Sequence, residues 1–242
     1  MTTARKVLII DCMGRELGAA MSKRVAETYE GRLPTVRIQA RAQPEWAGVL
    51  DQLRAGLYAG VIFTGSKAGV YEPEPWIEEL LAFTRDLVAL EPRAPTPVLG
   101  ICFGHQLIAE ATAGPDAVAA QPPVRRGIAE IEVTGDAPIF DGMPRRFRAI
   151  ITHQDHVLRI APQFEVVARA DYTPIHAVRH REKPIFGVQF HPEHCRATMA
   201  ADEREYAHHH WESMHDTALS AAEGPRVLDN FARIVVRAAG GA

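Results

Sequence analysis

The chain has 242 residues, a length that a single α/β domain can fill. Its net charge of −3 comes from 27 basic and 30 acidic side chains, which gives no electrostatic reason to expect nucleic acid or an anionic membrane as a partner. With 47% hydrophobic and 24% charged residues, the composition is that of an ordinary soluble globular protein and favours a domain that handles small molecules.

The chain shows no sign of a membrane or secretory segment. No apolar run approaches the roughly 18 residues that a membrane span needs. Residues 1–6 lead directly into the aliphatic run 7–10, which is too short for a signal-peptide core and has no small-residue cleavage site behind it. We therefore expect a cytoplasmic protein. Its three cysteines (Cys12, Cys102 and Cys195) are odd in number and widely spaced, which predicts free thiols.

The first hundred residues alternate short aliphatic runs with helical periods. Strands are expected at 7–11, 36–38, 60–64 and 97–102, and helices at 16–29, 44–53, 76–90 and 104–112. Strands that alternate with helices imply right-handed crossovers and a mostly parallel sheet with helices on both faces.

The pattern changes after Gly114. Strand-like runs at 128–133, 147–152, 164–169, 175–179 and 185–190 have no convincing helix between them, which predicts antiparallel β structure added to the parallel core. The last forty residues return to helix, at 202–222 and 226–238. We expect one α/β domain over 1–242, with a motif-bearing core at 6–193 and C-terminal helices within 199–239.

The most informative segment is an apolar strand that runs into Gly100-Ile-Cys102-Phe-Gly104 and then into a helix. This is the context of a nucleophile elbow, with cysteine in place of serine. The glycines permit a tight, strained turn that leaves the central side chain at the carboxyl edge of the sheet, where α/β proteins bind ligands. The helix N-terminus behind Cys102 favours the thiolate.

A cysteine nucleophile needs a base, and eleven histidines are available. The strongest candidate is His191, because it also follows a buried strand and has a carboxylate two residues further on. Residues i and i+2 of an extended chain point to the same side, so Glu193 can orient the imidazole. His105 lies in the first turn of the helix after Cys102 and is expected to help build the elbow.

Two segments together, Gly100-Ile-Cys-Phe-Gly-His-Gln106 and Gln189-Phe-His-Pro-Glu193, resemble the class I (triad) glutamine amidotransferase family, and within it the GMP-synthase-like branch. The resemblance runs from about residue 7 to 193. The segments 60–66 and 152–155, with Tyr71 and Trp76, add support. It implies a flavodoxin-like fold.

The resemblance also implies a mechanism. Cys102 would attack the γ-carboxamide of glutamine or of a γ-glutamyl compound and form a γ-glutamyl thioester. His191 would protonate the departing ammonia or amine and then activate water, while Glu193 orients His191. The family pattern implies no metal and no cofactor.

The same resemblance assigns the remaining parts of the site. The oxyanion hole would be the backbone N–H groups of Ser66 and Phe103. The substrate-binding residues would be Gly65, Gln106, His153, Gln154 and Asp155.

Two departures from the family pattern stand out. The oxyanion turn of the family is usually Gly-Gly-Pro or Asn-Gly-Pro, whereas this chain has Gly65-Ser66-Lys67. A serine can serve there if its backbone angles permit, because the donor is a backbone group. No stretch after Glu193 resembles an ATP pyrophosphatase, so we expect that this chain does not make GMP by itself.

Several alternatives stay open. The chain could supply ammonia to a separate synthetase subunit, or it could be a free-standing hydrolase of γ-glutamyl amides. A non-catalytic binding module on the same fold is a third reading, which the complete set of Cys102, His191 and Glu193 argues against. An α/β-hydrolase esterase would place its histidine after its acid, which is not the order found here.

The C-terminal region carries a histidine-rich run at 207–211, followed by His215. A zinc site is one interpretation, but no cysteine or carboxylate set at metal-ligand spacing accompanies the histidines, which favours a solvated helical patch. The charged stretch 202–205 is likewise expected to be a solvated helix face. The helices from Asp202 onward could cover the pocket or form a homodimer contact. Cys12 and Cys195 are interpreted as structural thiols, with Cys195 close to the site.

Overall fold

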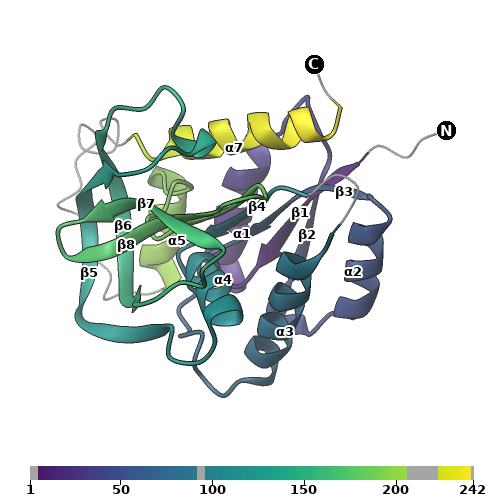
Figure 1. The fold of residues 1–242 in the computed structure, drawn as a ribbon, viewed down its shortest axis with the longest axis horizontal. Helices are drawn as coiled ribbons and strands as arrows, with labels where there is room; N and C mark the ends of the chain where they lie inside the picture. The colour runs from purple at the N-terminus through teal and green to yellow at the C-terminus, as the bar shows by residue number, and fades with distance from the viewer. Residues whose placement is uncertain (1–4, 92–95, 206–222, 241–242) are drawn as a thin grey trace.

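The computed structural model describes residues 5–91, 96–205 and 223–240 (Figure 1). Nine strands of this part of the chain form a single sheet in the order β2-β1-β3-β4-β9-β8-β7-β5-β6. The mixed α/β architecture predicted from the sequence is confirmed.

One half of the sheet is parallel. Its strands are β2 (Thr35–Gln39), β1 (Lys6–Asp11), β3 (Tyr58–Phe63), β4 (Val98–Ile101) and β9 (Ile185–Val188). Every residue of β3, β4 and β9 is buried, as expected for strands covered on both faces. At the edge, β2 alternates between exposed and half-buried residues.

The other half is antiparallel. Its strands are β8 (Thr173–His180), β7 (Phe164–Ala170), β5 (Val118–Val133) and β6 (Arg146–Val157). Here β5 and β6 are longer than predicted, and together they form a long ribbon at the end of the sheet.

One strand assignment was wrong. The run 185–190 was expected in the antiparallel portion, but β9 pairs in parallel with β4 and is antiparallel only to β8. Its burial and length fit either environment, so hydrophobic pattern alone does not fix its direction. The parallel pairing matters for the site, because it brings the carboxyl ends of β4 and β9 to the same edge.

Helices cover both faces of the parallel half (Figure 1). They are α1 (Arg15–Glu27), α2 (Trp46–Arg54), α3 (Pro75–Ala89), α4 (Phe103–Ala113), α5 (Arg196–Glu205) and α7 (Pro225–Ala238), with short 3₁₀ turns η1 (Ala40–Ala42) and η2 (Pro138–Phe140). Among these helices none is long and apolar enough to cross a bilayer.

Alternating side chains of the strands divide the core into two layers. Leu8 and Ile10 of β1 pack with α2, α3 and α4 on one face. Val7 and Ile9 pack with α7 and the end of α1 on the other face. This two-residue alternation is what a strand between two helical layers requires.

The C-terminal region differs from the prediction at its start. Helix α5 begins at Arg196, six residues before the expected start at Asp202, and packs against α1 through Ala201. The predicted helix at 226–238 is confirmed as α7. Residues 206–222, which hold the histidine-rich run, lie outside the described part of the chain.

Candidate active site

The turn between β4 and α4 is strained at Cys102. This residue has φ 51° and ψ −102°, a region that non-glycine residues rarely adopt. Its N–H still donates to the carbonyl of Val188 in β9 at 2.8 Å, while its own carbonyl accepts the first helical bond from Gln106 N at 3.0 Å. Cys102 is therefore the point at which the chain changes from strand to helix.

The two glycines of the elbow allow the chain to pass itself closely. A Cβ on Gly100 would lie 2.3 Å from the carbonyl oxygen of Gly104, and a Cβ on Gly104 would lie 2.6 Å from Cβ of Phe63. Neither position has room for a side chain. The glycine spacing read from the sequence therefore reflects a steric requirement of this turn.

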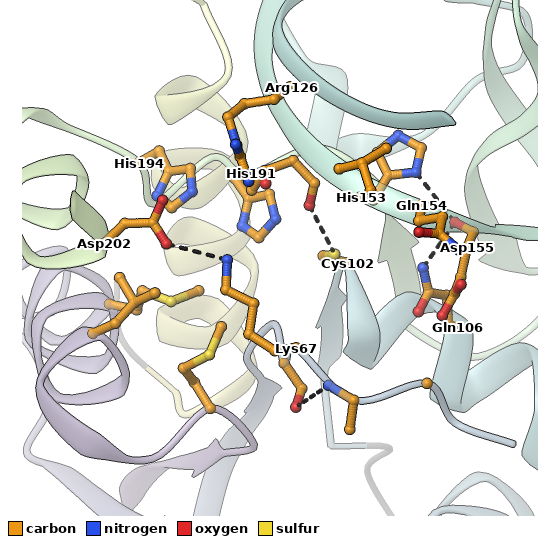
Figure 2. Close-up of a pocket in the computed structure, with 18 of the residues that line it drawn as sticks. Lys67, Cys102, Gln106, Arg126, His153, Gln154, Asp155, His191, His194 and Asp202 are labelled. Atoms are coloured by element: carbon orange, nitrogen blue, oxygen red, sulfur yellow. Dashed lines mark hydrogen bonds and ion pairs between the residues drawn. The ribbon is translucent and has the colours of Figure 1, made fainter. Parts of the chain in front are cut away.

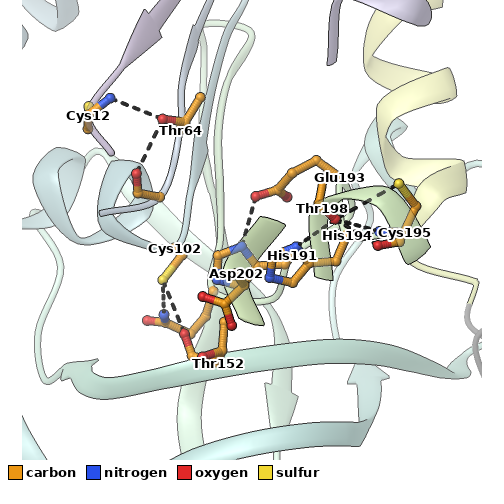
Figure 3. A network of polar contacts seen from close by, with 12 residues as sticks. Cys12, Thr64, Cys102, Thr152, His191, Glu193, His194, Cys195, Thr198 and Asp202 are labelled. Atoms are coloured by element: carbon orange, nitrogen blue, oxygen red, sulfur yellow. Dashed lines mark hydrogen bonds and ion pairs between the residues drawn. The ribbon is translucent and has the colours of Figure 1, made fainter. Parts of the chain in front are cut away.

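His191 and Glu193 form the buried pair that the sequence predicted. Nδ1 of His191 lies 2.8 Å from Oε1 of Glu193 (Figure 3). Both side chains are almost completely buried. A Cβ on Gly65 would lie 3.0 Å from Cε1 of His191 and 3.7 Å from Cβ of Cys102, so the imidazole and the cysteine flank the same glycine. The structure thus brings Cys102, His191 and Glu193 together from two separate segments.

The electrostatics of His191 favour its protonated form. Burial disfavours the imidazolium, but the negative charges of Glu193 and Cys102 outweigh burial and raise the pKa of His191 to about 10. Burial likewise opposes the charge on Glu193, and His191 overcomes this, so the pKa of Glu193 is lowered. Nε2 of His191 is buried and makes no hydrogen bond within the described residues, so it is available for proton transfer.

A cavity of about 350 Å³ opens over Cys102 and His191 (Figure 2). In Figure 2, Cys102 lies between two ends of this cavity, with Lys67, His194 and Asp202 at one end. The other end holds predicted substrate-binding residues, namely Gln106, His153, Gln154 and Asp155. All of these side chains line the cavity.

An amide network connects the cysteine to the substrate-binding end. Nε2 of Gln106 donates to Oε1 of Gln189 at 3.2 Å and to the carbonyl of Asp155 at 3.1 Å. Nε2 of Gln189 in turn lies 3.5 Å from Sγ of Cys102. The role of Gln189 was missed from the sequence, although the residue belongs to the motif around His191. The signal was present, because residues 189 and 191 are two apart in an extended segment and so point to the same side.

A second network fixes the tautomers of two buried histidines. Nδ1 of His153 lies 3.1 Å from the carbonyl of Asp155, which can only accept, so Nδ1 carries the proton and Nε2 is an acceptor. The hydroxyl of Tyr172 therefore donates to Nε2 of His153 at 3.1 Å and accepts from Nε2 of His176 at 2.8 Å. Burial lowers the pKa of His153 to about 3, so the imidazole in this chain of hydrogen bonds is uncharged.

The predicted oxyanion turn also lies at the cavity. Ser66 lines the cavity and adopts no positive φ, so a serine is compatible with this position. Phe103 opens α4, and the first N–H groups of a helix have no intrahelical acceptor. Within the described chain, neither the N–H of Ser66 nor that of Phe103 donates a hydrogen bond to another backbone group.

The sequence did not predict that Lys67, His194 and Asp202 line the cavity. Nζ of Lys67 lies 3.1 Å from Oδ1 of Asp202, and Asp202 is only 1% exposed. The expectation that 202–205 is a solvated face is therefore wrong for Asp202, because α5 turns this carboxylate toward the pocket. The ring of His194 stacks on that of His191 with centroids 4.4 Å apart, and burial lowers the pKa of His194 to about 3.

One group of described residues has the composition of a metal site. The ligand atoms of His191, Glu193 and His194 lie within 4.8 Å of one another. However, Nδ1 of His191 and Oε1 of Glu193 already bond to each other, and Nδ1 of His194 lies 3.2 Å from the hydroxyl of Thr198. These contacts match a base with its orienting acid better than a set of ligands.

The remaining candidates lie outside the cavity lining. His105 is fully buried, its pKa is lowered to about 4 by burial, and it packs against Gly187. Burial raises the pKa of the Cys12 thiol, and Cys195 is half-buried with its N–H bonded to Thr198. Neither thiol lines the cavity. The histidine cluster at 208–210 falls outside the described residues.

Known proteins resemble this chain in sequence and in fold. Residues 18–203 match the family model for class I glutamine amidotransferases. A glutamine-hydrolysing GMP synthase subunit from Pyrococcus furiosus is 36% identical over 153 residues, which are 63% of this chain and 76% of that protein. The corresponding protein of Pyrococcus abyssi is 45% identical over 146 residues, or 60% of this chain and 71% of that one.

Structural similarity extends further along the chain. The crystal structure of a glutamine amidotransferase from Thermotoga maritima superimposes with a TM-score of 0.75 and 19% identity, covering 96% of this chain and 98% of that one. A glutamine amidotransferase from Methylobacillus flagellatus gives a TM-score of 0.64 at 18% identity over 99% of this chain and 92% of its own. At such low identities, these superpositions establish a shared fold and nothing more. Together with the family match, they show that the chain belongs to the class I glutamine amidotransferase family.

Proposed function

We propose that this protein releases ammonia or an amine from the γ-carboxamide of glutamine or a γ-glutamyl compound, through a thioester on Cys102. The observation that carries this proposal is a thiol on a strained turn that lines the same cavity as His191, whose ring is bonded to the buried Glu193. Family membership supports glutamine as the donor.

The first half of the reaction forms the thioester. The Cys102 thiolate attacks the amide carbon, and negative charge develops on the amide oxygen, which the N–H groups of Ser66 and Phe103 stabilise. The His191 imidazolium then gives its proton to the departing nitrogen as the C–N bond breaks. Glu193 holds the imidazole in the required orientation through the 2.8 Å bond to Nδ1.

The second half returns the enzyme to its starting state. Neutral His191 takes a proton from water, and the resulting hydroxide attacks the thioester carbon. The C–S bond breaks, glutamate leaves, and the thiolate is again paired with an imidazolium. The raised pKa of His191 fits the first step, because the imidazolium is present to give its proton to the departing nitrogen.

The substrate-binding end supplies acceptors for an α-ammonium group. Both N–H bonds of the Gln106 amide are used, by Gln189 and by the carbonyl of Asp155, so Oε1 of Gln106 is the atom left for a substrate. The Asp155 carboxylate lies in the same end and accepts from the hydroxyl of Tyr71 at 3.1 Å. A glutamyl group would lie with its ammonium at these oxygens and its γ-carbon at Cys102.

Two fates of the released nitrogen are compatible with this site. The relatives are named as glutamine-hydrolysing subunits of GMP synthase, which supports a role as the glutaminase partner of a separate synthetase subunit. The alternative is a free-standing γ-glutamyl amide hydrolase. The third reading, a non-catalytic binding module on this fold, conflicts with the complete set of catalytic groups.

One experiment separates these readings. The purified protein is given glutamine and a panel of γ-glutamyl amines and peptides, and glutamate is quantified. Strong turnover of one γ-glutamyl compound with poor turnover of glutamine supports the hydrolase. Turnover of glutamine that rises when a synthetase partner is added supports the ammonia-supplying role. No glutamate from any substrate, with or without a synthetase, would contradict the proposal.

A further inference from the structure

The side chain of Thr64 lies beside Cys12, the residue after β1 (Figure 3), and Thr64 begins the turn that carries Ser66. Thr64 follows β3, is fully buried, and its N–H donates to the carbonyl of Ile10 at 3.1 Å. Its hydroxyl oxygen lies 3.0 Å from the backbone N of Cys12 and 3.2 Å from the carbonyl oxygen of Gly65. The hydroxyl thus lies between a donor and an acceptor.

The direction of these two bonds follows from the partners. A backbone N–H can only donate, so the Thr64 oxygen accepts from Cys12. The single hydroxyl proton is then free to bond the carbonyl of Gly65, which can only accept. The result is a directed chain from Cys12 N–H through the Thr64 hydroxyl to Gly65.

The bond to Gly65 also fixes the N–H of the next residue. The carbonyl of Gly65 and the N–H of Ser66 belong to one planar, trans peptide unit, so holding the oxygen sets the direction of the hydrogen. Gly65 has no side chain to restrict this unit, and it lies directly beside His191 and Cys102. An unanchored peptide here could rotate away from the reacting carbonyl.

The other side of the turn is anchored independently. Oγ of Ser66 accepts from the N–H of Ala68 at 3.2 Å, which holds the Ser66 side chain. Among the described residues, the Thr64 hydroxyl bonds directly to the peptide unit between Gly65 and Ser66. Its bond to the carbonyl also polarises the unit and makes the Ser66 N–H a stronger donor.

We infer that Thr64 is a positioning residue that aims the Ser66 N–H at the developing oxyanion. This inference rests on the proposed function, because the oxyanion exists only if Cys102 attacks an amide. It accounts for a working turn that has Ser66 and Lys67 in place of the glycine and proline usual in the family. The cysteine and histidine themselves are not expected to depend on the hydroxyl.

The test compares Thr64→Val, which removes the hydroxyl, with Thr64→Ser, which keeps it. Loss of a whole oxyanion donor lowers kcat by roughly 10²–10³-fold, so loss of its alignment is expected to lower kcat by about tenfold or more. KM for glutamine should change little, because the charge exists only in the transition state. Thr64→Ser should restore most of kcat, even if Thr64→Val also lowers the melting temperature.

A matched control makes the same change elsewhere. Thr84 in α3 is fully buried, and its hydroxyl has no hydrogen-bond partner within the described residues. Thr84→Val removes a buried hydroxyl away from the cavity and should leave kcat near the wild-type value.

Two alkylating reagents separate alignment of the oxyanion donor from damage to the thiol. Attack on the ketone of 6-diazo-5-oxo-norleucine develops an oxyanion, whereas iodoacetamide alkylates the thiol by displacement at carbon. Thr64→Val should slow inactivation by the first reagent and leave the rate of Cys102 alkylation by the second unchanged. Equal slowing of both reactions, or a wild-type kcat in Thr64→Val, would overturn the inference while leaving the proposed function intact. Failure of the wild-type protein to release glutamate from any substrate, with or without a synthetase, would instead refute the proposed function.

Discussion

At the scale of single residues, the three cysteines provide an internal comparison. Cys102 lies on the strained turn in the cavity, whereas Cys195 lies outside the cavity lining and near Thr198. The proposed thioester requires a sulfur at position 102 and none at position 195.

We expect Cys102→Ala to lose glutamate release by several orders of magnitude, because no other group can form the covalent intermediate. Cys195→Ala, which removes the same group outside the cavity lining, should keep the wild-type rate. Both variants are compared by quantifying glutamate released from the preferred substrate. Substantial turnover by Cys102→Ala would rule out the thioester mechanism.

Burial lowers the pKa of His191, whereas the charges of Glu193 and Cys102 raise it. The resulting pKa contributes to how the free energy of unfolding varies with pH. In the unfolded chain a histidine has a pKa of about 6.5. In the folded protein the pKa is raised to about 10, so the folded state binds this proton more tightly. The resulting stabilisation is fully present below about pH 6.5 and is lost as pH rises through about 10.

The expected result is a fall in the free energy of unfolding of the wild-type protein between about pH 7 and about pH 11 that is steeper than in His191→Gln. Glutamine cannot bind the extra proton, so the variant lacks this contribution. Urea unfolding of both proteins at several pH values measures the difference. Parallel curves for the two proteins would show that Glu193 and Cys102 do not hold a proton on His191.

At the scale of elements, the elbow depends on how closely α4 approaches β3. A Cβ on Gly104 would lie 2.6 Å from Cβ of Phe63 and 2.7 Å from its carbonyl oxygen. Both atoms are held in the centre of the sheet, so the helix must move if a side chain is added. A displaced α4 would carry the N–H of Phe103 with it.

Gly104→Ala is therefore expected to destabilise the protein by roughly 1–3 kcal/mol and to lower kcat, because overpacking shifts the backbone of the turn. Gly224→Ala is a suitable control. Its nearest neighbour would be 3.6 Å away, and its φ of −46° suits alanine. Urea unfolding and glutamate release of both variants test the prediction, and equal behaviour of the two would contradict a steric limit at Gly104.

Local patterns made much of the site predictable from the sequence. The elbow at Cys102 and the pair His191–Glu193 each lie within a few consecutive residues, so their spacing carries the geometry. The direction of β9 was not predictable in this way, because a short buried run looks the same in parallel and antiparallel pairing. The burial of Asp202 also depended on how α5 packs on α1, which no local pattern specifies.

At the scale of the whole molecule, both halves of the sheet contribute residues to the site. The parallel half supplies Cys102 and His191, and the antiparallel half supplies the wall from Thr152 to Asp155. The contacts between these halves are far apart in sequence and depend on strand register, which explains why no role for Tyr172 and His176 was predictable from the sequence alone.

The hydrogen-bonded chain of Tyr172, His153 and His176 joins β6, β8 and the turn between β7 and β8 at the wall of the pocket. The last bond of this chain ends on the carbonyl of Asp155, which also accepts from Gln106 of α4. Removing the Tyr172 hydroxyl leaves Nε2 of His153 without its donor. The segment from His153 to Asp155, which we propose binds the substrate, is then held less firmly. The His191–Glu193 pair is not touched by this change.

Tyr172→Phe is accordingly expected to raise KM for the glutamyl substrate by about tenfold, with a smaller change in kcat, since a hydrogen bond that positions a substrate acts on binding more than on the chemical step. Tyr29→Phe is the matched control, because Tyr29 is a buried tyrosine between α1 and the sheet whose hydroxyl has no partner among the described residues. Steady-state kinetics of both variants with the same substrate measure the effect. If Tyr172→Phe lowered kcat alone and left KM at the wild-type value, the network would act on the chemical step, and its assignment to substrate positioning would be wrong.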